Sequence, residues 1–262
     1  NMNVVKWIKD NLKFYSTLYS RKTETNYDGS STDEYGYLAD NKMYALQGIL
    51  EHQKKNIKSD LILHYHNYDR EYENAGYLDE YYSESVVFKS SRIVKKTKKF
   101  SYGVGSEYKY DWGHFNNKGS YAASTKGDIE NFGLFANTGY KFNDNQILSL
   151  YGRTDKNNST DTNHSYKINF TQEFNQLSLG ITHSTGLRNP SLFEMYGTDN
   201  YGINGNTNLE AEKSKINELN GRYNFSENIE FSSTVYRTRI FDRIETNSAY
   251  TTYENLNTDL NQ

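Results

Sequence analysis

The sequence predicts an all-β chain that folds as an antiparallel, up-and-down transmembrane β-barrel. Three observations predict this fold: apolar residues recur with a period of two, the alternating stretches run to about 10–14 residues, and the connections alternate between short and long. The first observation indicates strands with one polar face, the second a strand long enough to cross a bilayer, and the third a barrel with turns on one side and loops on the other.

The period of two is clearest between residues 100 and 112. Small or polar residues there separate the aromatic and aliphatic residues Phe100, Tyr102, Val104, Tyr108, Tyr110 and Trp112. The same alternation returns in 132–142, 166–174, 177–181 and 229–235, and no segment shows the spacing of an amphipathic helix. The polar face holds many Gly, Ser and Asn residues, which suit a wet lumen better than a packed core.

Taken in order, the pattern predicts twelve or thirteen strands. Their ranges are 3–8, 12–22, 43–53, 57–68, 84–95, 99–112, 128–142, 146–155, 164–174, 177–185, 213–225, 229–241 and 250–256. Tight turns fall near 9–11, 54–56, 96–98, 143–145, 175–176 and 226–228, and long loops near 23–42, 69–83, 113–127, 156–163, 186–212 and 242–249. The tight turns are typical of the periplasmic side of an outer-membrane barrel and the long loops of its extracellular side.

Composition excludes several classes of protein. Cysteine is absent from the 262 residues, which excludes disulfide frameworks, thiolate metal sites and cysteine nucleophiles. The formal net charge of −3 is too mild for a protein that neutralises nucleic-acid phosphates, and we expect no nucleic-acid partner. With 25 Tyr and 13 Phe, the chain is too aromatic for a disordered one. No catalytic constellation emerges, and we do not expect an enzyme.

The most specific motif lies in the longest loop. It begins at Gly186 and reads Gly186-Leu187-Arg188-Asn189-Pro190-Ser191-Leu192-Phe193-Glu194-Met195-Tyr196-Gly197. A second part follows at 205–215 and contains Glu212. This motif closely resembles the loop and following strand of TonB-dependent outer-membrane receptors. The sequence departs from that family at Thr207 and Ala211, where the family usually has proline, and at Met195, where leucine is common.

The resemblance implies a larger architecture than these residues provide. Such receptors are 22-stranded barrels with a plug domain inside. An N-terminal segment engages the periplasmic energy-transducing protein TonB. We therefore expect this chain, 1–262, to be the middle part of a receptor barrel with the plug absent, embedded as a monomer in the outer-membrane lipid of a Gram-negative bacterium. The implied function is energy-dependent uptake of a scarce, large nutrient such as cobalamin or an iron–siderophore complex.

Within that family the closest resemblance is to the vitamin B12 (cobalamin) receptors. It rests on Thr25-Asn26-Tyr27-Asp28, on the strand opening at 57–62, and on the acidic, tyrosine-rich stretch 68–79. That stretch is similar in character to the loop that contributes to calcium and cobalamin binding there.

Two sets of side chains are candidates for binding. The ligand-contacting set comprises Tyr35, Tyr72, Tyr77, Tyr81, Tyr82, Arg188, Phe193 and Tyr196. The oxygen-donor set, a candidate calcium site, comprises Asp28, Asp33, Asp40, Asp69, Glu73 and Asp79. Both sets have a simpler interpretation: the aromatic residues pack within loops, and the acidic residues keep those loops solvated. For the motif residues Gly186, Arg188, Pro190, Glu194, Gly197 and Glu212 we favour a structural role, because turn residues explain most of the pattern.

Two other functions fit the same pattern. A passive porin or a small, complete twelve-strand barrel would conduct ions without an energising partner. A soluble carbohydrate-binding β-protein would fold without detergent, with its apolar stripes turned inward.

Overall fold

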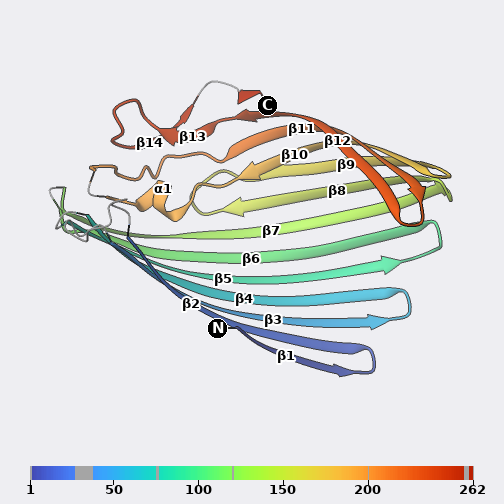
Figure 1. Cartoon of the computed structure of the whole chain (residues 1–262), viewed down its shortest axis with the longest axis horizontal. Helices are drawn as coiled ribbons and strands as arrows, with labels where there is room; N and C mark the ends of the chain where they lie inside the picture. The colour runs from blue at the N-terminus through green and yellow to red at the C-terminus, as the bar shows by residue number, and fades with distance from the viewer. Residues whose placement is uncertain are drawn as a thin grey trace.

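The computed structural model describes residues 2–26, 38–74, 77–119, 121–199, 201–256 and 260–261. Figure 1 shows one broad, strongly curved sheet that opens on one side like a trough. Thirteen strands form it in the order β1 to β12 followed by β15, and each pairs antiparallel with its neighbour. The all-β, up-and-down architecture predicted from the sequence is confirmed.

The strands are long and follow one another in the sheet in chain order. Their bounds are β1 Met2–Lys9, β2 Leu12–Asn26, β3 Leu38–Lys54, β4 Ile57–Asn74, β5 Tyr77–Lys95, β6 Phe100–Asn117, β7 Ala123–Asn143, β8 Gln146–Asn157, β9 Asn163–Phe174, β10 Leu177–Arg188, β11 Glu212–Ser226, β12 Ile229–Phe241 and β15 Leu260–Asn261. A short helix, α1 Leu192–Tyr196, and a small hairpin, β13 Arg243–Thr246 with β14 Tyr253–Leu256, lie outside this sheet.

Tight turns connect the strands at one end of the sheet. Asp10, Lys55 and Asn175 adopt positive φ angles of 50°, 50° and 41° in these turns. Such left-handed residues give two-residue hairpins the twist that matches the flanking strands. At the opposite end the chain makes its longer excursions, which carry α1, β13 and β14 (Figure 1).

The apolar stripes face the convex outside of the sheet. Val104 and Leu134 are 52% and 54% exposed, and the side chains of Phe132 and Ile181 are exposed as well. Residues that alternate with them, such as Gly103 and Gly180, are buried on the inner face. The sheet forms a single layer with its apolar side chains turned outward, which is the arrangement a lipid-facing wall requires.

Aromatic side chains border the apolar stripes. Tyr140 and Phe142 contact each other edge to face at 5.1 Å near the tight-turn end, and Tyr82 contacts Trp112 at 5.7 Å near the other end. Amphipathic rings at these two levels correspond to the aromatic girdles of outer-membrane barrels. The described helix α1 is too short to cross a bilayer.

The structure differs from the sequence prediction at the loop end. β4 runs to Asn74 and β5 starts at Tyr77, so most of the stretch 69–83 is strand rather than loop. β6 and β7 likewise extend into 113–127. The polar outer residues there break the apolar alternation, which hides the continuing strand from a hydrophobicity pattern.

Two further expectations were wrong. The predicted last strand, 250–256, does not join the large sheet, because β14 pairs with β13 in a separate hairpin, and β12 pairs with β15 instead. The sequence also shows no helical pattern, yet α1 forms within the longest connection. It is a five-residue helix with a capping box, which is too short to reveal a period of 3.6.

Leu46 and Gln47 test which face of the sheet meets lipid and which meets water. They are neighbours in the middle of β3; Leu46 is 42% exposed and shares the outer face with its cross-strand neighbours Leu18 and Tyr65. We expect Leu46→Arg to destabilise the membrane-inserted protein by about 2–4 kcal/mol, because a cation would face hydrocarbon near the bilayer midplane. Gln47→Arg, at the same depth on the wet inner face, should be tolerated. Heat-dependent gel mobility of the full-length protein from outer membranes measures both; equal damage by the two variants would contradict the assignment of faces.

Candidate functional site

The motif segment, residues 186–212, folds back across the inner face at the loop end of the sheet. Arg188, the last residue of β10, holds its two ends together. Its Nη1 donates to both carboxylate oxygens of Glu194 at 2.9 and 3.0 Å, and its Nε donates to Glu212 at 2.6 Å. Charge-assisted bonds of this kind are stronger and more directional than neutral ones. One guanidinium therefore ties helix α1 to the first residue of β11.

The two carboxylates that Arg188 contacts also serve the backbone. Glu194 accepts from the Ser191 N–H at 2.7 Å, while the Ser191 hydroxyl accepts from the Glu194 N–H at 3.2 Å, which completes the capping box of α1. Glu212 accepts from the Ile244 N–H at 2.8 Å and so holds the β13 strand. The hydrogen bond from Arg188 lowers the pKa of Glu212 below its ordinary value.

Close backbone packing folds the rest of the segment onto α1. The Gly205 N–H donates to the Gly197 carbonyl at 2.8 Å, and the Asn206 N–H donates to the Glu194 carbonyl at 2.9 Å. A Cβ at Gly205 would lie 2.4 Å from the backbone carbon of Met195, so only glycine fits there. Met195 and Leu209 are each 2% exposed and form part of a small apolar core at the loop end.

Tyr196 docks α1 onto the wall of the sheet. Its hydroxyl donates to the Asp128 carbonyl of β7 at 3.3 Å, and its own carbonyl accepts from the Thr125 hydroxyl. The ring lies directly over Gly127, where a Cβ would come within 2.3 Å of the ring carbons. Tyr196 is thus an anchor of the segment.

Asn189 makes a second attachment, to a polar network that follows the inner wall. Its Nδ2 donates to Asn131 at 3.2 Å, and Asn131 donates to Asp155 at 2.9 Å. Arg153 then contacts Asp155 at 2.7 Å and Glu107 at 2.8 Å. This chain of contacts connects the segment to groups deep in the lumen.

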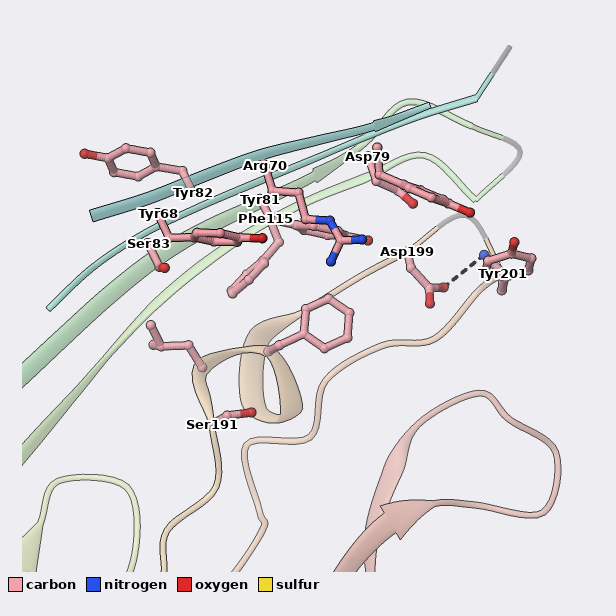
Figure 2. A pocket seen from close by; sticks show the side chains of 13 residues that line it. Tyr68, Arg70, Asp79, Tyr81, Tyr82, Ser83, Phe115, Ser191, Asp199 and Tyr201 are labelled. Atoms are coloured by element: carbon pink, nitrogen blue, oxygen red, sulfur yellow. Dashed lines mark hydrogen bonds between the residues drawn. The ribbon is translucent and has the colours of Figure 1, made fainter. Parts of the chain in front are cut away.

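A cavity of about 500 Å³ lies between the anchored segment and the inner faces of β4, β5 and β6. In Figure 2, Tyr68, Arg70, Asp79, Tyr81 and Phe115 project from the strands toward α1 and the chain that follows it. The lining also includes Tyr72, Tyr82, Ser83, Ser191, Leu192, Phe193, Asp199 and Tyr201. Tyr82 points outward, and six of the other twelve lining residues are Tyr or Phe. Aromatic faces therefore dominate the surface that a ligand would contact.

Phe193 is the centre of the aromatic lining. Its ring meets Tyr81 at 5.4 Å and Phe115 at 5.5 Å, both edge to face, and Tyr253 of the β13–β14 hairpin at 6.3 Å. Edge-to-face pairs of this kind add stabilisation beyond the area that they bury. The segment, the wall and the hairpin therefore meet at one side chain.

Charged groups occur at one side of the cavity. The Arg70 guanidinium lies 5.7 Å from the centre of the Tyr72 ring, and Asp79 is 1% exposed at the start of β5. Asp199 accepts from the Tyr201 N–H at 2.9 Å (Figure 2). The cavity thus offers aromatic faces together with one cationic and two carboxylate groups.

The structure separates the predicted ligand-contacting residues into three groups. Tyr72, Tyr81 and Phe193 line the cavity together. Tyr82 borders it, but its ring points to the outer face, where its hydroxyl bonds to Glu84 (Figure 2). Tyr77 is 43% exposed at the start of β5 and is not part of the lining.

The remaining predicted residues are structural or not described. Arg188 and Tyr196 anchor the segment rather than line the cavity, and Tyr35 lies outside the described residues. Sequence reasoning missed Tyr68, Arg70, Phe115, Asp199 and Tyr201. Extending the period of two along β4 would have placed Tyr68, Arg70 and Tyr72 on one face.

The acidic residues proposed for calcium lie on both faces of the wall in the part of the chain that the structure describes. Asp40, Asp69 and Glu73 alternate with inward-facing neighbours and lie on the outer face, whereas Asp79 lines the inner cavity. Asp40 is 3.3 Å from Lys22. No three acidic or histidine side chains converge as a metal site among the residues that the structure describes. Asp28 and Asp33 lie outside these residues, so the calcium site stays a prediction.

Comparison with known proteins identifies the family. The sequence profile described as "TonB dependent receptor-like, beta-barrel" matches residues 5–261. The chain belongs to this family. Its members are transport receptors, and the prediction from the motif at 186–212 is confirmed at the family level. No curated protein sequence matches this TonB-dependent receptor chain significantly.

Solved structures share the fold of this TonB-dependent receptor chain at low sequence identity. The siderophore receptor PirA from Acinetobacter baumannii aligns with a TM-score of 0.75 and 15% identity, over 99% of this chain and 46% of its own. The hemophore receptor HasR of Serratia marcescens aligns with 0.79 and 12%, over 99% and 50%. The copper transporter OprC aligns with 0.79 and 14%, over 98% and 47%. This chain therefore spans about half the length of these structures.

Gly127 tests whether the Tyr196 contact holds the segment on the wall. Gly127→Ala places a methyl group within the Tyr196 ring, so we expect α1 to lift and residues 192–205 to exchange amide hydrogens at least about tenfold faster. Gly152→Ala is the matched control, because a Cβ there meets nothing within 4 Å. Hydrogen exchange with mass spectrometry reads both variants; unchanged exchange in Gly127→Ala would contradict the anchoring role.

Glu212 makes the segment sensitive to acid. Its pKa in the folded protein lies below its ordinary value of 4.5, so its stabilising contribution is present above that value and is lost as the pH falls through the folded pKa. Glu212→Gln should therefore speed hydrogen exchange in 188–197 and 243–246 at pH 6. Below the folded pKa, wild type and variant should converge. A difference in exchange rate between wild type and Glu212→Gln that persists below the folded pKa would show that the charge of this carboxylate does not stabilise the segment.

Proposed function

We propose that this chain forms part of the barrel wall and the extracellular ligand-binding mouth of an outer-membrane receptor that takes up a large, scarce nutrient complex. The single observation that carries the proposal is the cavity of about 500 Å³ roofed by the anchored motif segment. It opens on the inner side of the wall at the long-loop end, where a ligand from outside would arrive first.

The lining fits a bulky ligand with flat or conjugated parts. Tyr81, Phe115 and Phe193 present ring faces and edges to the cavity, and such surfaces bind planar groups without needing many hydrogen bonds. Arg70 would supply a cation to an anionic part of the ligand, with a fork of donors suited to carboxylates and similar groups.

Two ligand classes follow from separate lines of support. The resemblance of 57–62 and 68–79 to the cobalamin receptors favours a corrinoid. The similar solved structures include siderophore receptors and a hemophore receptor, which favours an iron chelate. Both are large, partly conjugated molecules, and the aromatic lining suits either of them.

We further propose that uptake requires energy from the inner membrane through TonB. The family membership supports this step. Movement of a plug would open the path, and the residues for that movement belong to other parts of a complete receptor. In this chain the polar network from Asn189 through Asp155 to Glu107 lines the inner wall that a plug would face.

A passive pore is the competing function for a barrel. The family match and the segment that crosses the mouth of the trough both favour the receptor. Planar-bilayer recordings of the full-length protein discriminate the two: the receptor should show no steady conductance without TonB, and large open currents would favour the pore.

Tyr81 and Tyr82 provide a matched pair for the binding proposal. They are consecutive residues of β5. The Tyr81 ring contacts Phe193 at 5.4 Å, whereas the Tyr82 ring points away from the cavity (Figure 2). We expect Tyr81→Leu to weaken ligand binding about tenfold, as expected for the loss of a buried aromatic contact. Tyr82→Leu should change affinity less than twofold. Cobalamin and ferric siderophores, titrated separately against the purified full-length receptor, provide the readout; equal effects of both variants on every ligand would contradict this site.

A further inference from the structure

A cationic hollow lies at the opposite end of the sheet, beside the tight turn between β3 and β4. Its volume is about 560 Å³, and its lining includes His52, Lys54, Lys55, Ser59 and Arg92. Among the residues that the structure describes, no carboxylate lines it. The hollow therefore concentrates positive charge at the rim of the barrel.

The hollow opens on the lipid-facing side of the wall. His52, Ser59 and Arg92 occupy one transverse row, since Ser59 pairs with His52 on one side and with Arg92 on the other. Two residues further along β4, Leu61 is 42% exposed on the outer face. Residues two apart in a strand share a face, so the row of Arg92 also faces outward.

Apolar side chains begin directly next to the cations. The adjacent outer row contains Leu50, Leu61 and Ser90, and the next contains Leu63 and Phe88, which are 48% and 46% exposed. Rows on one face of a strand are about 7 Å apart. This step from charge to hydrocarbon matches the step from the headgroup to the acyl chains of a phospholipid.

The cations of the hollow are not neutralised within the described part of the chain. The side chains of Lys54, Lys55 and Arg92 make no hydrogen bond or ion pair there. Nearby Lys58 differs, because Glu51 and Asp60 lie 3.6 and 3.4 Å from its Nζ. Lys55 has a φ of 50° in the tight turn that follows β3.

We propose that this hollow binds the headgroup of an anionic phospholipid in the leaflet on the tight-turn side of the membrane. The Arg92 guanidinium would donate two hydrogen bonds to the phosphate oxygens, and the ammonium groups of Lys54 and Lys55 would add positive charge. One acyl chain would lie along Leu61 and Leu63. The site rests on the membrane-embedded fold and is independent of ligand uptake at the other end.

Native mass spectrometry of the purified full-length receptor, titrated with phosphatidylglycerol, tests the site. The triple variant Lys54→Gln, Lys55→Gln, Arg92→Gln should bind this lipid about tenfold more weakly than wild type. The control removes the same charge from the neighbouring turn with Lys95→Gln, Lys96→Gln, Lys98→Gln, and should bind like wild type. Heat-dependent gel mobility verifies that each variant is folded, and Arg92→Gln alone replaces the triple variant if that one fails to assemble.

Three results would overturn the proposal. Equal losses of phosphatidylglycerol binding in the two triple variants would show that the positively charged rim attracts this lipid in general and that the hollow is not a specific site. Equal binding of phosphatidylcholine with the same acyl chains would show that the headgroup charge is irrelevant. Displacement of the lipid by millimolar inorganic phosphate would assign the hollow to a free anion. Persistence of the lipid under that phosphate, with cobalamin or siderophore binding unchanged in the variants, supports the phospholipid site.

Discussion

Every part of this structure depends on one constraint: a backbone that crosses hydrocarbon must pair all of its N–H and C=O groups within the protein. The chain satisfies it with a ladder of neighbouring strands in which residues 57–73 of β4, for example, each pair with a partner on β3 and another on β5. Because the ladder fixes the alternation of side chains, one face must suit lipid and the other water. The outward position of Val104 and Leu134 and the inward position of Gly103 follow from that single requirement.

The same ladder provides a rigid frame on which the motif segment is built. Arg188 stands at the end of one strand and Glu212 at the start of the next, so the ion pair between them closes a long excursion at its base. Within that closed excursion, Glu194 caps a helix and Tyr196 rests on a glycine of the wall. Phe193 is thereby held against rings of two other elements, which creates the cavity without any large hydrophobic core.

The two ends of the wall have different chemistry because they meet different surroundings. At the long-loop end, aromatic rings and a few charges face inward around a cavity, which suits capture of a solute. At the tight-turn end, Lys54, Lys55 and Arg92 face outward beside apolar rows, which suits a lipid headgroup. We therefore propose solute binding on the inner face at one end of the sheet and lipid binding on the outer face at the other.

The sequence by itself determined the first twelve strands apart from their ends, their two faces and the family, since a period of two and the motif around Arg188 are local features that need no knowledge of distant contacts. It did not show that β4 continues to Asn74 or that β5 begins at Tyr77, because the outer face there is polar and the apolar alternation stops. It also did not bring Arg70, Phe115 and Asp199 into one cavity. These residues lie far apart along the chain, and only the curvature of the sheet and the folding back of the segment onto its inner face place them side by side.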